Sequence, residues 1–109
     1  MHELALATSI AGAVCERAAG RPVRRVTVRV GALTAVVPEA MRFCFGLAVE
    51  GTVAEGAGLV IEHLPGTGHC RSCGDDFPLP DLILLCPCGS ADVAVTSGRE
   101  LQLVSMEVD

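Results

Sequence analysis

The sequence predicts an α+β fold, in which two helices cover one face of a three-stranded sheet and a cysteine-rich, zinc-binding lobe is inserted between the second and third strands. Three observations lead to this prediction. Two stretches carry apolar residues at helical spacing, three have apolar patterns typical of strands, and two close cysteine pairs stand in a segment rich in glycine, proline and aspartate. The chain has 109 residues, of which 50% are apolar, so we expect one domain-sized core beside a smaller lobe.

Two helices are predicted from stripes of apolar residues. The first covers residues 4–19 and ends at Gly20, and its stripe consists of Leu4, Ala7, Ala11, Val14 and Ala18. The second begins at Pro38, which suits the first helical position, and its stripe consists of Met41, Cys44, Phe45 and Ala48. Cys15 and Cys44 lie on or beside these stripes, so we expect them to be small buried apolar residues.

Three strands complete the layer. The first alternates polar and apolar residues, with Val26, Val28 and Val30 on the apolar side. The second spans residues 59–64, and the third resumes at residue 100. In the third strand the apolar phase changes at Val104, which predicts either a β-bulge there or a strand that is buried on both faces.

The insert between the second and third strands carries the strongest chemical signal. It contains two cysteine pairs, each followed by a glycine: Cys70-Arg71-Ser72-Cys73-Gly74 and Cys86-Pro87-Cys88-Gly89. Two such pairs are typical of a structural zinc site, and the glycines permit the positive φ that a metal-binding turn needs. A redox dithiol and a disulfide pair are the alternatives, and a redox dithiol would explain neither the second pair nor the two glycines.

The second pair is one residue shorter than a usual Cys-x-x-Cys turn. Either the turn at Cys86 and Cys88 is distorted, or one of these two cysteines is not a ligand and His69 takes its place. Four thiolates on one zinc ion would carry a net charge of −2, and Arg71 and the backbone amides would help to offset it.

The N-terminus offers a second metal-binding arrangement. The amine of Met1, the amide nitrogen of His2 and the His2 imidazole can form two fused chelate rings, and three nitrogens in one plane suit Ni(II) or Cu(II). A helix that begins here has unpaired N–H groups in its first turn, so losing one amide proton breaks no helical hydrogen bond. The helix dipole disfavours a cation at this end, and the Glu3 carboxylate counters it.

The charge balance excludes several partners. The 8 basic residues, all arginine, face 13 acidic ones, which gives a net charge of −5 and argues against a phosphate-binding surface. We therefore expect no nucleic acid partner. No apolar run approaches the roughly 20 residues of a membrane span, and Glu3 stands where an export signal would carry positive charge. We expect no membrane partner, a cytoplasmic location and reduced cysteines.

Several segments together resemble the hydrogenase nickel-incorporation protein family, HypA/HybF. In chain order they are Met1-His2-Glu3-Leu4, Val28-Arg29-Val30-Gly31-Ala32-Leu33, Val37-Pro38-Glu39-Ala40, the cysteine insert and Ser97-Gly98-Arg99-Glu100-Leu101. The resemblance covers essentially the whole chain. It implies a cytoplasmic metallochaperone that delivers nickel for [NiFe]-hydrogenase maturation and works with a nickel-handling GTPase and the hydrogenase large subunit.

The resemblance also implies two metal sites. Nickel is the transient cargo and binds at Met1, His2 and Glu3, while zinc is structural and binds at Cys70, Cys73, Cys86 and Cys88. The nickel-binding helix–sheet domain is then predicted over residues 1–66 and 98–109, and the zinc-binding insert over residues 67–97.

Two other classes of function are weighed against nickel delivery. An enzyme would need a base, a nucleophile and an enclosed pocket, whereas the histidines and cysteines here group as metal ligands, so we expect no enzyme. The alternative is a zinc-ribbon interaction module without nickel delivery, which would need a basic or aromatic face.

Overall fold

A computed structural model of the chain describes residues 2–109, and it divides into two compact units. The first unit comprises the chain up to Arg29, Val36–Glu62 and Gln102–Asp109. The second unit comprises Val30–Ala35 and His63–Leu101. The second unit is therefore larger than the predicted insert, and it includes the last two residues of the first strand and the turn that follows them.

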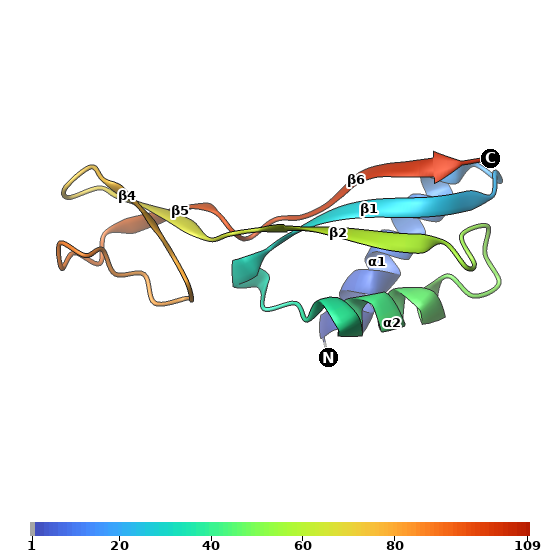
Figure 1. Ribbon diagram of the computed structural model, residues 1–109, viewed down its shortest axis with the longest axis horizontal. Coiled ribbons are helices and arrows are strands. Elements are labelled where there is room, and N and C mark those ends of the chain that lie inside the picture. Colours follow the sequence, from blue (N-terminus) through green and yellow to red (C-terminus); the bar gives the residue numbers. More distant parts are fainter. Residues whose placement is uncertain (1) are drawn as a thin grey trace. The chain divides into compact units, whose positions relative to one another are not determined.

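Two helices and a three-stranded sheet form the first unit. The helices are α1 (His2–Ala18) and α2 (Pro38–Ala48), and the sheet has the order β2-β1-β6, with β1 (Val23–Gly31) in the centre between β2 (Gly58–Leu64) and β6 (Leu101–Val108). Both helices lie on one face of this sheet (Figure 1). The predicted fold class is thus confirmed, with the edges of both helices within a few residues of the predicted ones.

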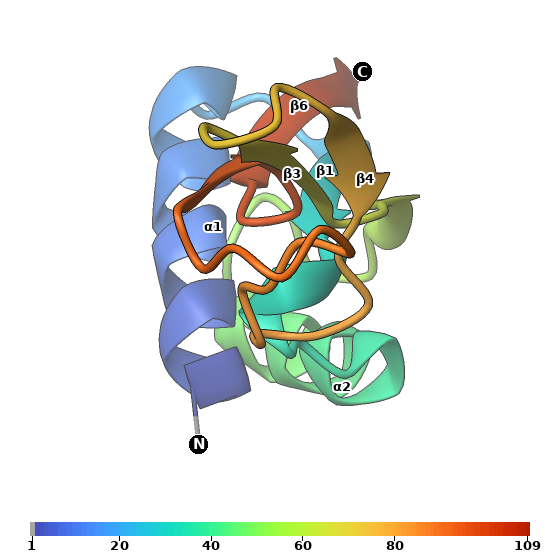
Figure 2. The ribbon, with the colours of Figure 1, turned by 90° about the vertical axis from the view of Figure 1, so that its left-hand side faces the viewer.

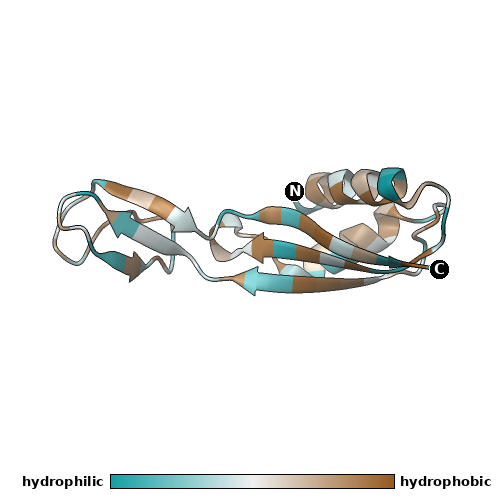
Figure 3. Ribbon diagram, turned by 90° about the horizontal axis from the view of Figure 1, so that it is seen from above, coloured by the Kyte–Doolittle hydropathy of each residue, from teal (hydrophilic) through white to brown (hydrophobic). Residues whose placement is uncertain are grey.

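The core of the first unit lies between the helices and the sheet. Val26 and Val28 of β1 are 0% exposed, and they face the buried stripes of the helices, which consist of Ala7, Ile10, Ala11, Val14, Ala18, Met41, Cys44 and Phe45. Apolar and polar segments alternate along the strands in Figure 3, as the period of two requires. Leu4 differs from the prediction, since it is 46% exposed rather than part of the buried stripe.

The outer side of β1 is held by ion pairs between strands. Arg25 lies 3.2 Å from Glu107 on β6, and Arg29 lies 3.2 Å from Glu62 on β2. These arginines are therefore neutralised by carboxylates and do not form a basic surface for phosphates. In β6 the two consecutive residues Val104 and Ser105 are both exposed, so the alternation of exposed and half-buried residues shifts by one position there. This strand is not buried on both faces.

A second three-stranded sheet organises the cysteine-rich unit. Its order is β4-β3-β5, formed by β3 (Thr67–Cys70), β4 (Asp76–Pro78) and β5 (Val93–Ser97), and both pairings are antiparallel. The sequence predicts no strands here, because each is only three to five residues long.

A 3-10 turn, η1 (Ala32–Thr34), joins this unit from a distant part of the chain. The N–H of Leu33 donates to the carbonyl of Gly98 at 2.8 Å, and the N–H of Gly31 donates to the carbonyl of Glu100 at 2.8 Å. Gly98 has φ of 113°, and a Cβ atom on it would lie 2.7 Å from the Cα of Gly66. Glycine is required at position 98 both for its backbone conformation and for this close approach.

Candidate metal centre

The first cysteine pair lies on a turn that follows β3. Cys70 is the last residue of that strand, and its carbonyl accepts a hydrogen bond of 2.8 Å from the N–H of Gly74. The N–H of Cys73 points at the Cys70 sulfur, with 3.4 Å between nitrogen and Sγ. Gly74 has φ of 82°, which only glycine adopts readily. The turn thus aims backbone N–H groups at a sulfur, as a thiolate ligand requires.

The second pair forms a tighter version of the same turn. The carbonyl of Cys86 accepts a 2.8 Å hydrogen bond from Gly89, three residues on rather than four, and Gly89 has φ of 96°. The N–H of Cys88 lies 3.4 Å from the Cys86 sulfur, the same distance as in the first pair. The turn is shortened by the missing residue, yet both sulfurs of the pair still point to one place.

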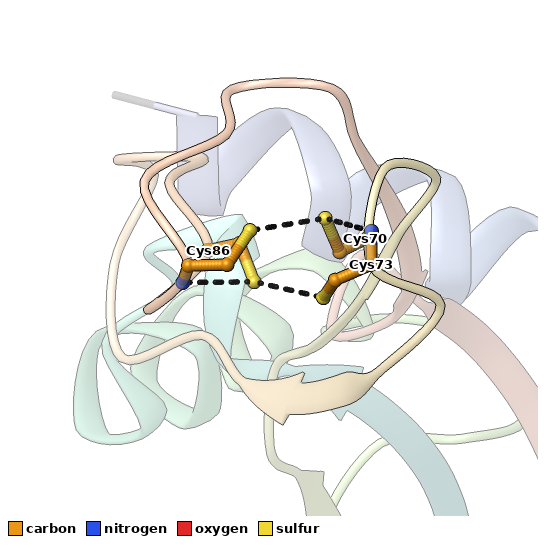
Figure 4. A group of neighbouring side chains, drawn as sticks. Cys70, Cys73 and Cys86 are labelled. Atoms are coloured by element: carbon orange, nitrogen blue, oxygen red, sulfur yellow. Dashed lines mark hydrogen bonds between the residues drawn. The ribbon is translucent and has the colours of Figure 1, made fainter.

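The four sulfurs of the two pairs form one cluster (Figure 4). Cys70 Sγ and Cys88 Sγ are 3.7 Å apart, as are Cys73 Sγ and Cys86 Sγ, and all four atoms lie within 4.8 Å of one another. A tetrahedral zinc ion with Zn–S bonds of about 2.3 Å separates its sulfurs by about 3.8 Å. A disulfide bond is only about 2.05 Å long, so these distances belong to free thiols. The donor set and its spacing fit a four-coordinate ion.

The thiols of the cluster have different pKa values. The N–H of Cys73 and a second N–H, that of Ser72, lower the pKa of Cys70 to about 6. The N–H of Cys88 also lowers the pKa of Cys86, but burial and the neighbouring thiols outweigh it and raise that pKa to about 12. Without a cation, the four sulfurs therefore cannot all be thiolates near neutral pH. A divalent ion would supply the charge that holds them deprotonated.

Two side chains near the cluster have other partners. His69 does not join the four sulfurs, because its Nδ1 lies 2.7 Å from the Asp76 carboxylate. Arg71, expected to offset the charge of the thiolates, forms an ion pair of 2.8 Å with Asp92. The charge of the sulfurs is instead offset by backbone donors, among them the N–H groups of Cys73 and Cys88.

An apolar shell packs directly against two of the cysteines. Cys70 and Cys86 are 0% and 4% exposed, and they share one buried cluster with Leu33, Phe77, Leu79 and Val93. Leu33 is not among the predicted site residues, because it lies more than thirty residues before the cysteines. The signals that could have indicated it are Gly31 and Gly98, since glycines on either side of a packed leucine allow two backbones to approach.

At the other predicted metal site the structure describes His2 and Glu3, while Met1 lies outside the described residues. The His2 side chain is 49% exposed, in the first turn of α1, and its Nδ1 lies 3.6 Å from Glu3 Oε1. Glu3 is 8% exposed, and its Oε2 accepts a 3.2 Å hydrogen bond from the N–H of Val37. Its own N–H and that of Val37 hold its pKa below the usual value. The end of α1 beside α2 is visible in Figure 2.

The two remaining cysteines stand apart from both sites. Cys44 is buried in the core of the first unit, as predicted, and Cys15 is half-buried on α1. Both are free thiols.

In the described part of the chain, no helix is long and apolar enough to cross a membrane.

A small helix-and-sheet unit joined to a four-cysteine cluster defines a metal-binding protein. A protein-family model described as "Hydrogenase/urease nickel incorporation, metallochaperone, hypA" matches residues 1–108. The hydrogenase maturation factor HypA of Geobacter metallireducens is 44% identical over 111 residues, and the alignment covers 100% of both chains. That of Nostoc punctiforme is 40% identical over 109 residues, covering 100% of this chain and 96% of the other.

Solved structures agree with the sequence relatives. The solution structure of the Ni metallochaperone HypA from Helicobacter pylori matches with a TM-score of 0.67 and 26% identity, covering 97% of this chain and 96% of that one. A second solution structure of a HypA protein matches with a TM-score of 0.68 and 28% identity, covering 99% and 96%. The chain belongs to the HypA family of hydrogenase/urease nickel-incorporation metallochaperones.

Proposed function

We propose that this protein carries nickel and passes it on for the maturation of [NiFe]-hydrogenase, with no catalytic activity of its own. The observation that carries this proposal is the match of the whole chain to the HypA family. The partners are then a nickel-handling GTPase and the hydrogenase large subunit, and the location is the cytoplasm. The net charge of −5 favours encounter with a basic surface on a partner.

Zinc is proposed to bind at Cys70, Cys73, Cys86 and Cys88 and to fix the shape of the second unit. The sulfur spacing of 3.7 Å fits zinc–thiolate bonds, and four sulfurs leave no open position on the ion. An ion enclosed in this way exchanges slowly and offers no site for catalysis, so its contribution is folding free energy.

Nickel is proposed to bind at the N-terminus, in a site made by Met1, His2 and Glu3. The Met1 amine, the His2 amide nitrogen and His2 Nδ1 provide three donors in a plane, which is the geometry that Ni(II) prefers. The exposed His2 side chain leaves the ion accessible from solvent. An exposed ion with few protein donors can be transferred to a partner by ligand exchange.

Nickel titration of a protein that begins at Met1 tests this proposal. We expect about one nickel per chain at the terminus, with the yellow absorption of a square-planar ion. His2→Ala, and separately a short extension before Met1, should abolish this nickel, while zinc content and fold stay unchanged. His63→Ala is the matched control, because it removes an exposed histidine on β2. Equal nickel binding by the extended chain would contradict the terminal site.

A further inference from the structure

The second sheet has two outer strands of different character, β4 and β5 (Figure 1). An outer strand presents unpaired N–H and C=O groups, and proteins protect such edges with charged side chains, proline or bulges. β4 carries Asp76 and Pro78, whereas β5 has neither a charged residue nor a proline. Among residues 2–109 no strand pairs with the outer side of β5, and its one irregularity is a bulge at Thr96. The part of β5 before this bulge is therefore an unprotected edge.

The backbone of Val95 faces this edge. The N–H of Arg71 donates to the carbonyl of Asp92 at 2.9 Å, at one end of the ladder between β3 and β5. Bonded and unbonded residue pairs alternate along an antiparallel ladder, so the next bonded pair is Ala94 with His69. The N–H and C=O of Val95 consequently point away from β3, where a further strand would find them.

An open pocket of about 220 Å³ adjoins this edge, and one stretch of chain lines it: Val95, Thr96, Ser97, Arg99 and Glu100. Arg99 is exposed, and within residues 2–109 it has no ion-pair partner, whereas Arg24, Arg25, Arg29 and Arg71 all pair with carboxylates. The Glu100 carboxylate instead accepts a hydrogen bond of 2.7 Å from the N–H of Gly98. The pocket thus contains an arginine whose charge is available to a ligand.

The hydroxyl groups beside Arg99 form a hydrogen-bonded chain with one direction. The Ser97 hydroxyl donates to the carbonyl of Pro65 at 3.0 Å, so the Thr67 hydroxyl, 2.7 Å from Ser97 Oγ, is the donor to Ser97. Thr96 Oγ1 also lies 2.7 Å from Thr67 Oγ1, and it donates there because the single Thr67 proton is already used. The exposed Thr96 oxygen can then only accept. Arg99 is therefore the side-chain donor that an anionic group in this pocket would find.

We propose that β5 accepts an extended segment of a partner protein as a fourth strand of the second sheet, and that an acidic side chain of this segment binds Arg99. The N–H and C=O of Val95 hold the backbone of the segment, as in other cases of strand addition, and the pocket receives the neighbouring side chain. The charge of Arg99 attracts an aspartate or glutamate and repels a basic residue. None of these residues belongs to either proposed metal site, so the inference goes beyond nickel delivery and does not depend on it.

Synthetic peptides of alternating threonine and valine test this proposal on the protein as purified, without added nickel. Each has about eight residues, a usual strand length, and blocked ends, so that a single glutamate provides its only charge. Two peptides place the glutamate near the first or the last residue and so cover both strand directions. One matched peptide has lysine in place of glutamate. Another carries N-methyl groups on its central residues and cannot pair with a strand.

Hydrogen exchange of single amides, followed by NMR, shows whether a strand is added. At a peptide concentration of about ten times its Kd, exchange at Val95 should slow about tenfold, because the bound peptide protects this outward-facing amide. Ala94, which is already bonded to β3, should slow less. The N-methylated peptide should leave both amides unchanged.

Peptide titrations followed by the same amide signals measure the role of the charge. We expect the lysine peptide to bind about fivefold more weakly than the better of the two glutamate peptides. Arg99→Gln should remove this difference, because it keeps a side chain of similar polarity without the charge. Arg42→Gln is the matched control, since Arg42 is an exposed arginine on α2 in the first unit.

Three results would overturn the inference. If neither glutamate peptide protects Val95, or if the N-methylated peptide protects it equally, no strand is added. Equal binding of the glutamate and lysine peptides would remove the role of Arg99. Val95 protection that grows with protein concentration in the absence of peptide would assign the edge to a second copy of this chain. Because no nickel is present, failure of the proposed terminal nickel site would leave all these measurements unchanged.

Discussion

Leu33 is expected to hold the cysteine-rich unit together, although it lies outside the insert that the cysteines define. Its side chain is 7% exposed and packs in one cluster with Cys70, Phe77, Leu79, Cys86 and Val93. Its N–H is bonded to the carbonyl of Gly98 at 2.8 Å, so the backbone of η1 is fixed as well. Leu33→Ala removes the side chain and keeps this hydrogen bond, which isolates the effect of packing.

The magnitude follows from the burial of the side chain. Leu→Ala deletes three buried carbon atoms, worth about 2.4 kcal/mol at about 0.8 kcal/mol each. A cavity that relaxes only in part adds more, and the usual range for this substitution is about 2–5 kcal/mol. We expect a loss of about 3 kcal/mol, which raises the unfolded fraction of the unit more than 100-fold at about 1.4 kcal/mol per factor of ten. Small units have little stability beyond this, so the metal-free variant should be largely unfolded there.

Hydrogen exchange of metal-free protein measures this unit separately from the first one. Protection should fall in β3 and β5 of Leu33→Ala, while α1 stays close to the parent. Leu85→Ala is the matched control, because it makes the same substitution in the same unit at a side chain that is 52% exposed. Unchanged protection of β3 would refute the role of Leu33, and equal loss in α1 would show that the chain unfolds as one cooperative unit.

Three further outcomes are expected. Gly98→Ala should lower the thermal unfolding temperature, because φ at this position is 113° and there is no room for a Cβ atom. Gly12→Ala should raise that temperature, because this position lies in open space on α1 and alanine favours the helix over glycine. Metal analysis after chelator challenge should find zinc retained at about one per chain in His69→Ala and lost from Cys88→Ser, since the histidine pairs with Asp76. Cys70 has a folded-state pKa of about 6 against a usual 9.0. In denaturant titrations the metal-free unit should therefore become more stable as the pH rises from about 6 to 9, and it should lose this stability as the pH falls back to about 6.

The helices and the first sheet could be predicted because their residues repeat with a fixed period. Val26 and Val28 alternate with polar residues, and the helical stripes recur every three or four residues, so burial follows from the local pattern alone. Leu4 departs from the helical pattern, because an apolar residue of the stripe is buried only where another part of the protein packs over it. At the first turn of α1 that buried position belongs to Glu3, whose carboxylate has a hydrogen-bond donor in Val37.

The second sheet could not be predicted, since its strands are too short to show a period. What fixes them is pairing between distant residues: Gly68 lies opposite both Phe77 and Val95 in the two ladders. A Cβ atom on Gly68 would come within 3.1 Å of the Phe77 ring, so this glycine makes room for a neighbour on another strand. Such a role depends on the packed structure and leaves no local signal beyond the glycine itself.

The turn at the second cysteine pair is one residue shorter than the first, and it still directs two sulfurs to the cluster. A sulfur cluster needs two sulfurs per turn aimed at one point, an N–H directed at a sulfur, and a glycine that reverses the chain. The turn at Cys86 and Cys88 keeps all three, because its closing hydrogen bond moves from the fourth residue to the third. For building the sulfur cluster, the spacing between the two cysteines is therefore a weaker requirement than the glycine that follows them. Gly89, with φ of 96°, allows the tighter turn. The residue between Cys86 and Cys88 contributes no donor atom to the cluster.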